Sequence, residues 1–159
     1  MLYLGIAVLI MGALFTYGWN IAGLSVKSSV VRETAAAAES IDRTITSEIR
    51  QAESVDQGAS TFDNSPAKLV LRETDNTETV IAVIDGQVTL RRGAADPVVL
   101  HAEDIRADNF IFTQQVSTTD ETEYVGFSFD AVAAYPGSVK QNAYQYSLPV
   151  KSGASLRNH

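Results

Sequence analysis

Two groups of acidic residues come nearest to a chemical site in this chain. They are Glu103, Asp104 and Asp108 in one group, and Asp120, Glu121 and Glu123 in the other. Carboxylate oxygens are the ligands that Ca²⁺ prefers, but a calcium loop alternates its ligands around a central glycine. Neither group has that spacing. We therefore predict no metal site and interpret both groups as solvated surface charge.

Residues suited to nucleophilic or acid–base catalysis are scarce. The chain has no cysteine and only two histidines, His101 and His159. It also lacks a glycine-rich phosphate loop, a G-x-S-x-G nucleophile motif and an H-E-x-x-H zinc motif. We expect His101 to be a surface or packing residue. The sequence thus predicts no catalytic residue, no cofactor and no enzymatic activity.

The charge balance argues against nucleic acid as a partner. The 159 residues include 12 Lys+Arg and 19 Asp+Glu, which gives a formal net charge of -7. Binding to phosphates needs clustered basic side chains, whereas here they are scattered and Arg91-Arg92 is the only adjacent pair. A chain of this length fits one domain, or one domain with an appendage.

The elements that would position any site begin with an uncharged segment. Residues 1–26 contain no charged side chain, and Tyr17 and Trp19 lie near one end of the segment. A bilayer core of about 30 Å needs roughly 20 apolar helical residues, and aromatic rings favour its interfaces. We therefore predict that residues 1–26 form a helix that spans a lipid bilayer.

Residues 27–54 continue as an amphipathic helix. They contain no glycine or proline, and their apolar residues recur at spacings of three and four. We expect five of them to pack on a sheet: Val31, Ala38, Ile41, Ile45 and Ile49. Together the two segments predict one helix of about 50 residues, which is roughly 75 Å long.

Residues 55–150 show short β-type runs at 68–74, 79–84, 87–92, 109–116 and 123–133. Asp85-Gly86 separates two of the runs and predicts a tight hairpin turn. We also expect a short strand at 98–101, one helical turn at 102–107, and a last strand through Tyr144 and Tyr146 that ends at Pro149. Residues 151–159 have no apolar periodicity and predict a mobile tail. The combination predicts an α+β layer, with the helix packed on one antiparallel sheet of four to six strands.

These segments resemble those of the type IV pilin and type II secretion pseudopilin superfamily, most closely the J-type minor pseudopilins and related minor pilins. The resemblance lies in LYLGIA at 2–7, IDRTITSEIRQA at 41–52, KLVL at 68–71, IDGQVTLRR at 84–92, VLHAEDI at 99–105 and NFIF at 109–112. It covers nearly the whole chain. The family's basic leader and Phe-x-x-x-Glu-like motif are missing before the apolar run, so we expect either a truncated start or an unprocessed chain.

The resemblance implies a minor pilin or pseudopilin that acts in filament initiation, capping or assembly. Its partners would be the bilayer, other pilin subunits and an inner-membrane assembly platform. It would be a single-pass protein of the cell envelope, with its C-terminal domain extracytoplasmic and on a surface filament when assembled. The expected membrane and helix–helix contacts are Leu4, Gly5, Val8, Gly12, Phe15, Gly18, Trp19 and Ala22.

Two other hypotheses remain open on the sequence. In one, the chain is a single-pass, membrane-anchored extracytoplasmic β module that binds a partner or ligand without polymerising. In the other, it is a membrane-tethered hydrolase of an unseen type, which the scarcity of catalytic residues disfavours. The first would share the apolar helix and the sheet but would not need contacts between like helices.

Overall fold

The computed structural model describes residues 2–116, 123–133 and 146–156, and at residues 2, 4, 8, 9, 16, 18–26 and 116 it describes the backbone alone. Helix α1 runs over Leu2–Gln51. Eight strands follow it: β1 (Ser54–Val55), β2 (Lys68–Arg72), β3 (Glu78–Ile84), β4 (Gln87–Arg92), β5 (Val98–Val99), β6 (Ile105–Val116), β7 (Glu123–Ala133) and β8 (Ser147–Ser155).

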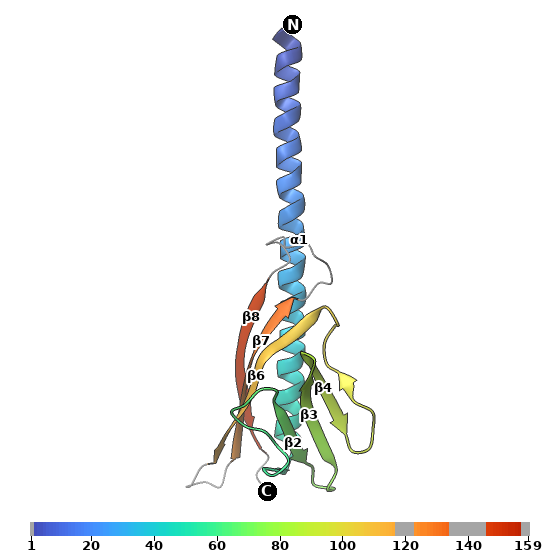
Figure 1. Cartoon of the computed structure of the whole chain (residues 1–159), viewed down its shortest axis with the longest axis vertical. Coiled ribbons are helices and arrows are strands. Elements are labelled where there is room, and N and C mark those ends of the chain that lie inside the picture. The colour runs from blue at the N-terminus through green and yellow to red at the C-terminus, as the bar shows by residue number, and fades with distance from the viewer. Residues whose placement is uncertain (1, 117–122, 134–145, 157–159) are drawn as a thin grey trace.

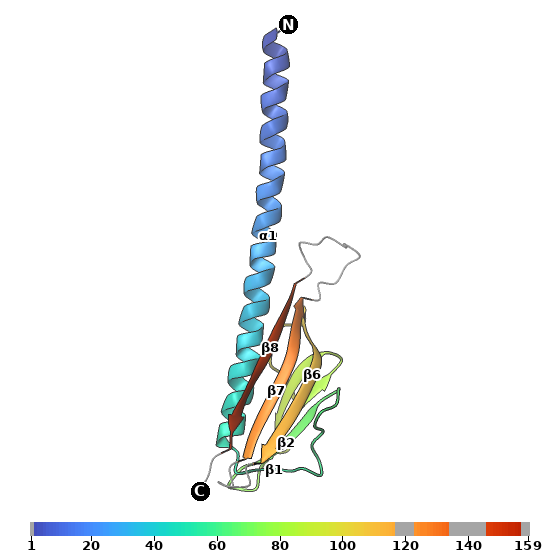
Figure 2. The ribbon, with the colours of Figure 1, turned by 90° about the vertical axis from the view of Figure 1, so that its left-hand side faces the viewer.

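Helix α1 is the long axis of the molecule. Its first half stands clear of the strands, and both sheets lie along its second half (Figure 1). Figure 2 shows the same separation from the side, with β8 and β7 running beside the lower part of the helix. One continuous helix therefore meets two surroundings, a packed one towards its C-terminus and an open one towards its N-terminus.

The strands form two antiparallel sheets. The first has the order β1-β2-β3-β4-β5 and the second has the order β6-β7-β8. After β5 the chain turns, and β6 takes β7 as its ladder partner instead of β5. A single backbone hydrogen bond, from the Ala107 N–H to the Gly86 carbonyl at 2.8 Å, joins β6 to the β3–β4 turn.

The three-stranded sheet carries an aromatic cluster. Asp108 pairs with Asp130 and Ile111 with Ser128, so that Asn109 and Phe110 both lie opposite one residue of β7. This β-bulge, with Asn109 at a φ of 53°, shifts the buried positions of β6 by one residue, so that Ile105 and Ala107 before it and Phe110 and Phe112 after it are all buried. Phe110, Phe112, Phe127 and Phe129 are all buried, and their ring centroids lie 5.0–6.4 Å apart.

A single main core joins the helix to both sheets. Ile41, Ile45 and Ile49 of α1 have no exposed surface, and they share one cluster with residues of both sheets. The sheets contribute, among others, Leu69, Leu71, Ile81, Val88, Phe112 and Phe127. Burying an aliphatic side chain stabilises a fold by about 1.5–3 kcal/mol, so these three isoleucines contribute strongly to the packing of α1 in this core.

Three local predictions are wrong. The predicted tail over 151–159 is largely strand, because β8 runs to Ser155 and pairs with β7 as far as Tyr124. Backbone pairing needs no apolar alternation, and Pro149 is tolerated because β8 is an edge strand. The predicted helical turn over 102–107 is also wrong, because Ile105 already begins β6. The last strand was predicted to end at Pro149, but β8 continues past this residue to Ser155. Tyr144 and residues 157–159 lie outside the described residues.

The predicted fold class, a pilin-like α+β fold with a membrane-spanning helix on one small sheet, is wrong. The strands form two sheets, since apolar alternation indicates strands but not which strands pair. Within the part of the chain that the structure describes, no helix is long and apolar enough to cross a membrane. The prediction took residues 2–26 as apolar enough, although Thr16, Asn20, Ser25 and four glycines interrupt them.

The membrane finding also corrects the predicted location. The single-pass membrane assignment, the cell-envelope location and the extracytoplasmic placement all rested on a span at residues 1–26, and they are wrong with it. The same holds for the pilus and secretion-system terms, and for the membrane anchor of the alternative β module. What remains to be explained is an uncharged helix half that stands clear of the sheets.

The core isoleucines provide a test of how the helix is held. Replacing Ile45 by Ala should lower the free energy of unfolding by about 2–5 kcal/mol, because it removes a fully buried side chain and leaves a cavity. The measurement is urea unfolding followed by circular dichroism. Ile10→Ala, the same change in the open half of α1, should cost less than about 0.5 kcal/mol. Equal losses in the two variants would contradict the packing described here.

Candidate functional site

The open half of α1 carries most of the large apolar side chains that the described part of the chain exposes. Seven of them lie within 15 residues of helix, and their relative exposure ranges from 48% to 86%. They are Tyr3, Ile6, Ile10, Met11, Leu14, Phe15 and Tyr17. Scattered exposed apolar residues are ordinary, whereas a contiguous patch marks an interaction surface. We call these seven side chains the open apolar surface.

The residues predicted for helix–helix contact overlap this surface only in part. Phe15 belongs to it, and Gly5 and Gly12 have no heavy atom within 4 Å of the position that a Cβ would occupy. The other five predicted side chains lie outside the described residues; they are Leu4, Val8, Gly18, Trp19 and Ala22. The structure thus shows room at the two glycines.

The prediction for helix–helix contact missed six members of the open apolar surface, since it named four small residues and, among the large ones, only Leu4, Val8, Phe15 and Trp19. The position of each residue around the helix would have identified three of them. At about 100° per residue, Tyr3, Ile10 and Tyr17 fall on one side of a helix. Applied to residues 1–26, that arithmetic would have placed these three residues on the side away from Gly5 and Gly12.

The predicted helix–sheet contacts lie where the helix meets the sheets, except at one end. Ala38, Ile41, Ile45 and Ile49 are buried, but Val31 is only half-buried. At this end Val30 and Thr34 are the buried residues, and Val30 packs with Ile105 and Ala133 in a small separate cluster.

Thr34 explains why the prediction placed Val31, and not Val30, among the buried residues of the helix. Its hydroxyl donates a hydrogen bond to the Val30 carbonyl at 2.9 Å, within the helix itself. A polar side chain satisfied in this way can be buried at little cost. Because Thr was counted as polar, the predicted set of buried residues began at Val31, whereas Val30 and Thr34 are the buried residues here.

An ion pair fixes the lower half of α1 to β4. Glu48 is 5% exposed, and both of its carboxylate oxygens accept hydrogen bonds from the Arg92 guanidinium, the Nε–Oε2 contact being 3.2 Å. Hydrogen bonding and attraction by the Glu48 carboxylate raise the pKa of Arg92 above its ordinary value. No local pattern indicated this pair, because its two members lie 44 positions apart.

The predicted hairpin residues, Asp85 and Gly86, form the turn between β3 and β4. Ile84 pairs with Gln87 across it, and both turn residues have positive φ, 52° and 79°. Two positive φ values are typical of a type I′ turn. Gly86 also lies against Arg106, whose Nε would be 2.7 Å from an added Cβ. A glycine at this turn therefore serves both the backbone conformation and the approach of β6.

The residues considered first for chemistry do not converge. Among the described residues, no group of three His, Asp or Glu could hold a metal ion. Asp108 lies 3.7 Å from Arg106, and Asp120 and Glu121 lie outside the described residues. His101 accepts a hydrogen bond from the Val88 N–H at 3.0 Å through Nε2, and its Nδ1 lies 2.9 Å from the Ala102 carbonyl. It therefore ties the chain after β5 to β4.

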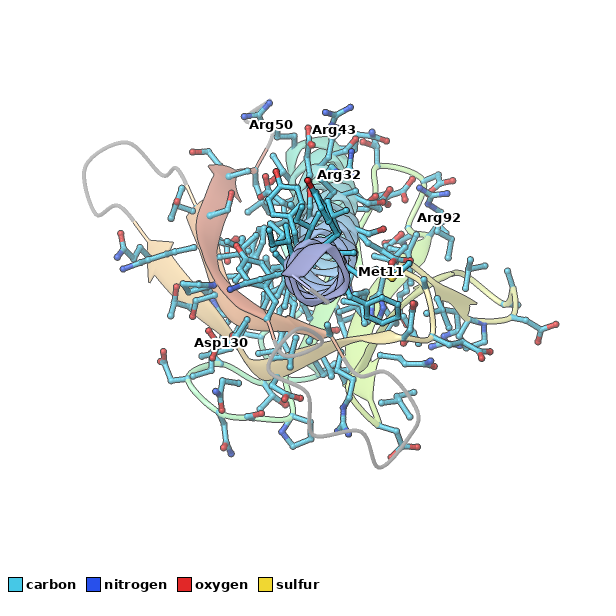
Figure 3. The ribbon with its side chains drawn as sticks, turned by 90° about the horizontal axis from the view of Figure 1, so that it is seen from above. Met11, Arg32, Arg43, Arg50, Arg92 and Asp130 are labelled. Atoms are coloured by element: carbon cyan, nitrogen blue, oxygen red, sulfur yellow. The ribbon has the colours of Figure 1, made fainter. Side chains whose placement is uncertain are left out.

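The outward face of the lower half of α1 is charged. Figure 3 shows Arg32, Arg43 and Arg50 on one side of the molecule and Asp130 on another. Arg43 pairs with Glu39, and Asp42 lies beside Arg43 in a shallow hollow of this face. Alternating charge of this kind is typical of a solvated helix face. The same helix therefore carries a charged outward face in its lower half and an apolar surface in its open half.

Comparison with protein-family models, with curated proteins and with solved structures finds no match for this chain. The resemblance to pilins and pseudopilins stays a prediction. The function is therefore argued from the surface just described.

The ion pair between α1 and β4 gives a direct test. Arg92→Met should lower the free energy of unfolding by about 1–3 kcal/mol, because it leaves the buried Glu48 carboxylate without its partner. The matched control is Arg91→Met, whose side chain lies on the other face of β4 and should change it by less than about 0.5 kcal/mol. Adding Glu48→Leu to Arg92→Met should restore most of the loss in urea unfolding. A double variant no more stable than Arg92→Met would contradict the assignment.

Proposed function

We propose that this chain is a structural subunit that assembles with other subunits through the open apolar surface of α1. The observation that carries the proposal is the exposure of seven large apolar side chains on the half of the helix that stands clear of both sheets. The sheets and the lower half of α1 form the body of the subunit. No catalytic step is part of the proposal.

The form of the surface favours assembly over binding of a small molecule. Small-molecule sites are concave and bury most of their ligand, whereas one isolated helix presents a convex surface. Helices are covered instead by other helices, whose side chains fit between their ridges. A helix that is apolar on several sides needs several neighbours, as in the interior of a bundle.

The charge distribution supports an uncharged helix half for assembly and a charged body that stays outside the contact. Residues 1–26 carry no charge, while the remaining residues carry the whole formal charge of -7. Uncharged helix halves can approach one another without electrostatic cost, and charged bodies keep an assembly in solution. The proposal keeps the assembly step that the resemblance implies and leaves out membrane insertion, the cell envelope and any assignment to a pilus or secretion system.

The test removes the apolar character of the surface and leaves the body intact. A variant with Ile6, Ile10, Met11, Leu14 and Phe15 all replaced by Ser should lose self-association. The parent chain should form assemblies whose size grows with concentration. The measurement is sedimentation velocity over a concentration series. The melting temperature of the body should be unchanged, because these side chains are exposed.

A matched control replaces exposed serines on the same helix. Ser28, Ser29 and Ser40, changed together to Ala, should leave assembly as in the parent chain. A parent chain that stays monomeric at every concentration would contradict the proposal. So would a five-residue variant that assembles as the parent does.

A further inference from the structure

Strand β8 leaves a free edge in the three-stranded sheet. It is the last strand in the order β6-β7-β8, and among the described residues its only ladder partner is β7. The unpaired N–H and C=O groups of an edge strand are a template on which a strand of another chain can add, and a long edge offers more of them. At nine residues, β8 is a long edge that needs protection.

The other sheet edges are protected in ways that the structure shows. In the five-stranded sheet the edge strands β1 and β5 have two residues each. In the three-stranded sheet the edge of β6 is bonded to other parts of the chain. The Ala107 N–H donates to the Gly86 carbonyl at 2.8 Å, and the Phe112 carbonyl accepts from the Asp63 N–H at 2.9 Å. By contrast, β8 is neither short nor bonded along its outer edge to any described residue.

The hydrogen bonds at its two ends show which backbone groups of β8 face outward. The Tyr146 carbonyl accepts from the Ala133 N–H at 3.1 Å, and the Leu156 N–H donates to the Glu123 carbonyl at 2.9 Å. Tyr146 and Leu156 therefore face β7, and the register between them is unbroken. Successive residues of an antiparallel strand turn their backbone groups to opposite sides. The residues that face the free edge are therefore Ser147, Pro149, Lys151, Gly153 and Ser155.

Pro149 and Lys151 occupy two of these five positions, and both are exposed. Proline has no backbone N–H, so an added strand would meet a missing donor at position 149. Lys151 places a charge at the middle one of the five positions. If β8 of a second copy paired antiparallel over all nine residues, the two Lys151 side chains would stand directly opposite each other. Like charges at such a pair are destabilising.

We infer that Pro149 and Lys151 prevent the edge of β8 from pairing with β8 of a second copy of this chain. The inference goes beyond the proposed function, because it concerns the body of the subunit and does not need the open apolar surface. Proline and lysine are residues with which native proteins blunt such edges. The two residues thus act in specificity, since chains that meet are left to make contact through other surfaces.

The test restores the edge and removes the open apolar surface. Pro149→Thr and Lys151→Thr are added to the variant in which five residues of that surface are replaced by Ser. Threonine favours strands, supplies the missing N–H and carries no charge. In sedimentation velocity, this edge variant should form dimers at concentrations at which the five-residue variant is monomeric. In hydrogen exchange, the amides of residues 151, 153 and 155 should exchange about tenfold more slowly at high than at low concentration, because they become hydrogen-bonded.

The matched control is Lys68→Thr with Pro97→Thr, which makes the same two changes at exposed positions, one in β2 and one just before β5. In the same background it should leave sedimentation and exchange unchanged. Circular dichroism checks that both variants keep the fold. An edge variant whose amides at 151, 153 and 155 exchange equally fast at every concentration would overturn the inference.

The exchange measurement keeps this inference separate from the proposed function. A parent chain that stays monomeric would contradict the proposed function, and the edge variant can still be compared with its background. If the five-residue variant itself associated, protection of the three outward amides in the edge variant would still report pairing at β8.

Discussion

The packing of one helix against two sheets is the constraint on which the rest of this structure depends. Ile41, Ile45 and Ile49 are buried in one cluster with residues of both sheets, and Glu48 binds Arg92 of β4. The helix lies closest to β8 and β7 of the three-stranded sheet, and β4 of the other sheet contacts β6 directly. The second half of α1 is therefore part of the core that joins the two sheets into one body.

The same constraint leaves the first half of α1 without cover from the sheets. The strands lie along the lower half only (Figures 1 and 2), and the described side chains between Tyr3 and Tyr17 are exposed. An apolar helix in water needs partners, because most helical stability in proteins comes from packing of an apolar face. Assembly is thus the consequence of a helix that is longer than the body that it anchors.

The sequence predicted those parts of the fold that local patterns determine. Spacings of three and four predicted the buried residues from Ala38 to Ile49, and the Asp85-Gly86 pair predicted the turn between β3 and β4. Parts that depend on distant partners could not be found in this way. The separation into two sheets depends on which strands pair, and Glu48 is buried because Arg92 reaches it from β4. The strand at Ser147–Ser155 depends on backbone pairing with β7 and has no apolar alternation to reveal it.

The candidate surface was only partly predictable for a related reason. An uncharged segment indicated an environment other than water, and a bilayer was the simplest choice. The structure instead ties the segment to a charged body and shows which of its described side chains are exposed. Gly5 and Gly12 lie on one side of α1, and Tyr3, Ile10 and Tyr17 lie on the other.

Cross-linking at two positions of α1 tests the central claim most directly. The chain has no cysteine, so Ile10→Cys and Ser40→Cys each introduce one exposed thiol, the first on the open apolar surface and the second on the lower half of α1. Under mild oxidation, chains with Cys at position 10 should form covalent dimers much faster than chains with Cys at position 40. Dimers that form equally fast at both positions, or faster at position 40, would show collision without a specific contact and would contradict the account.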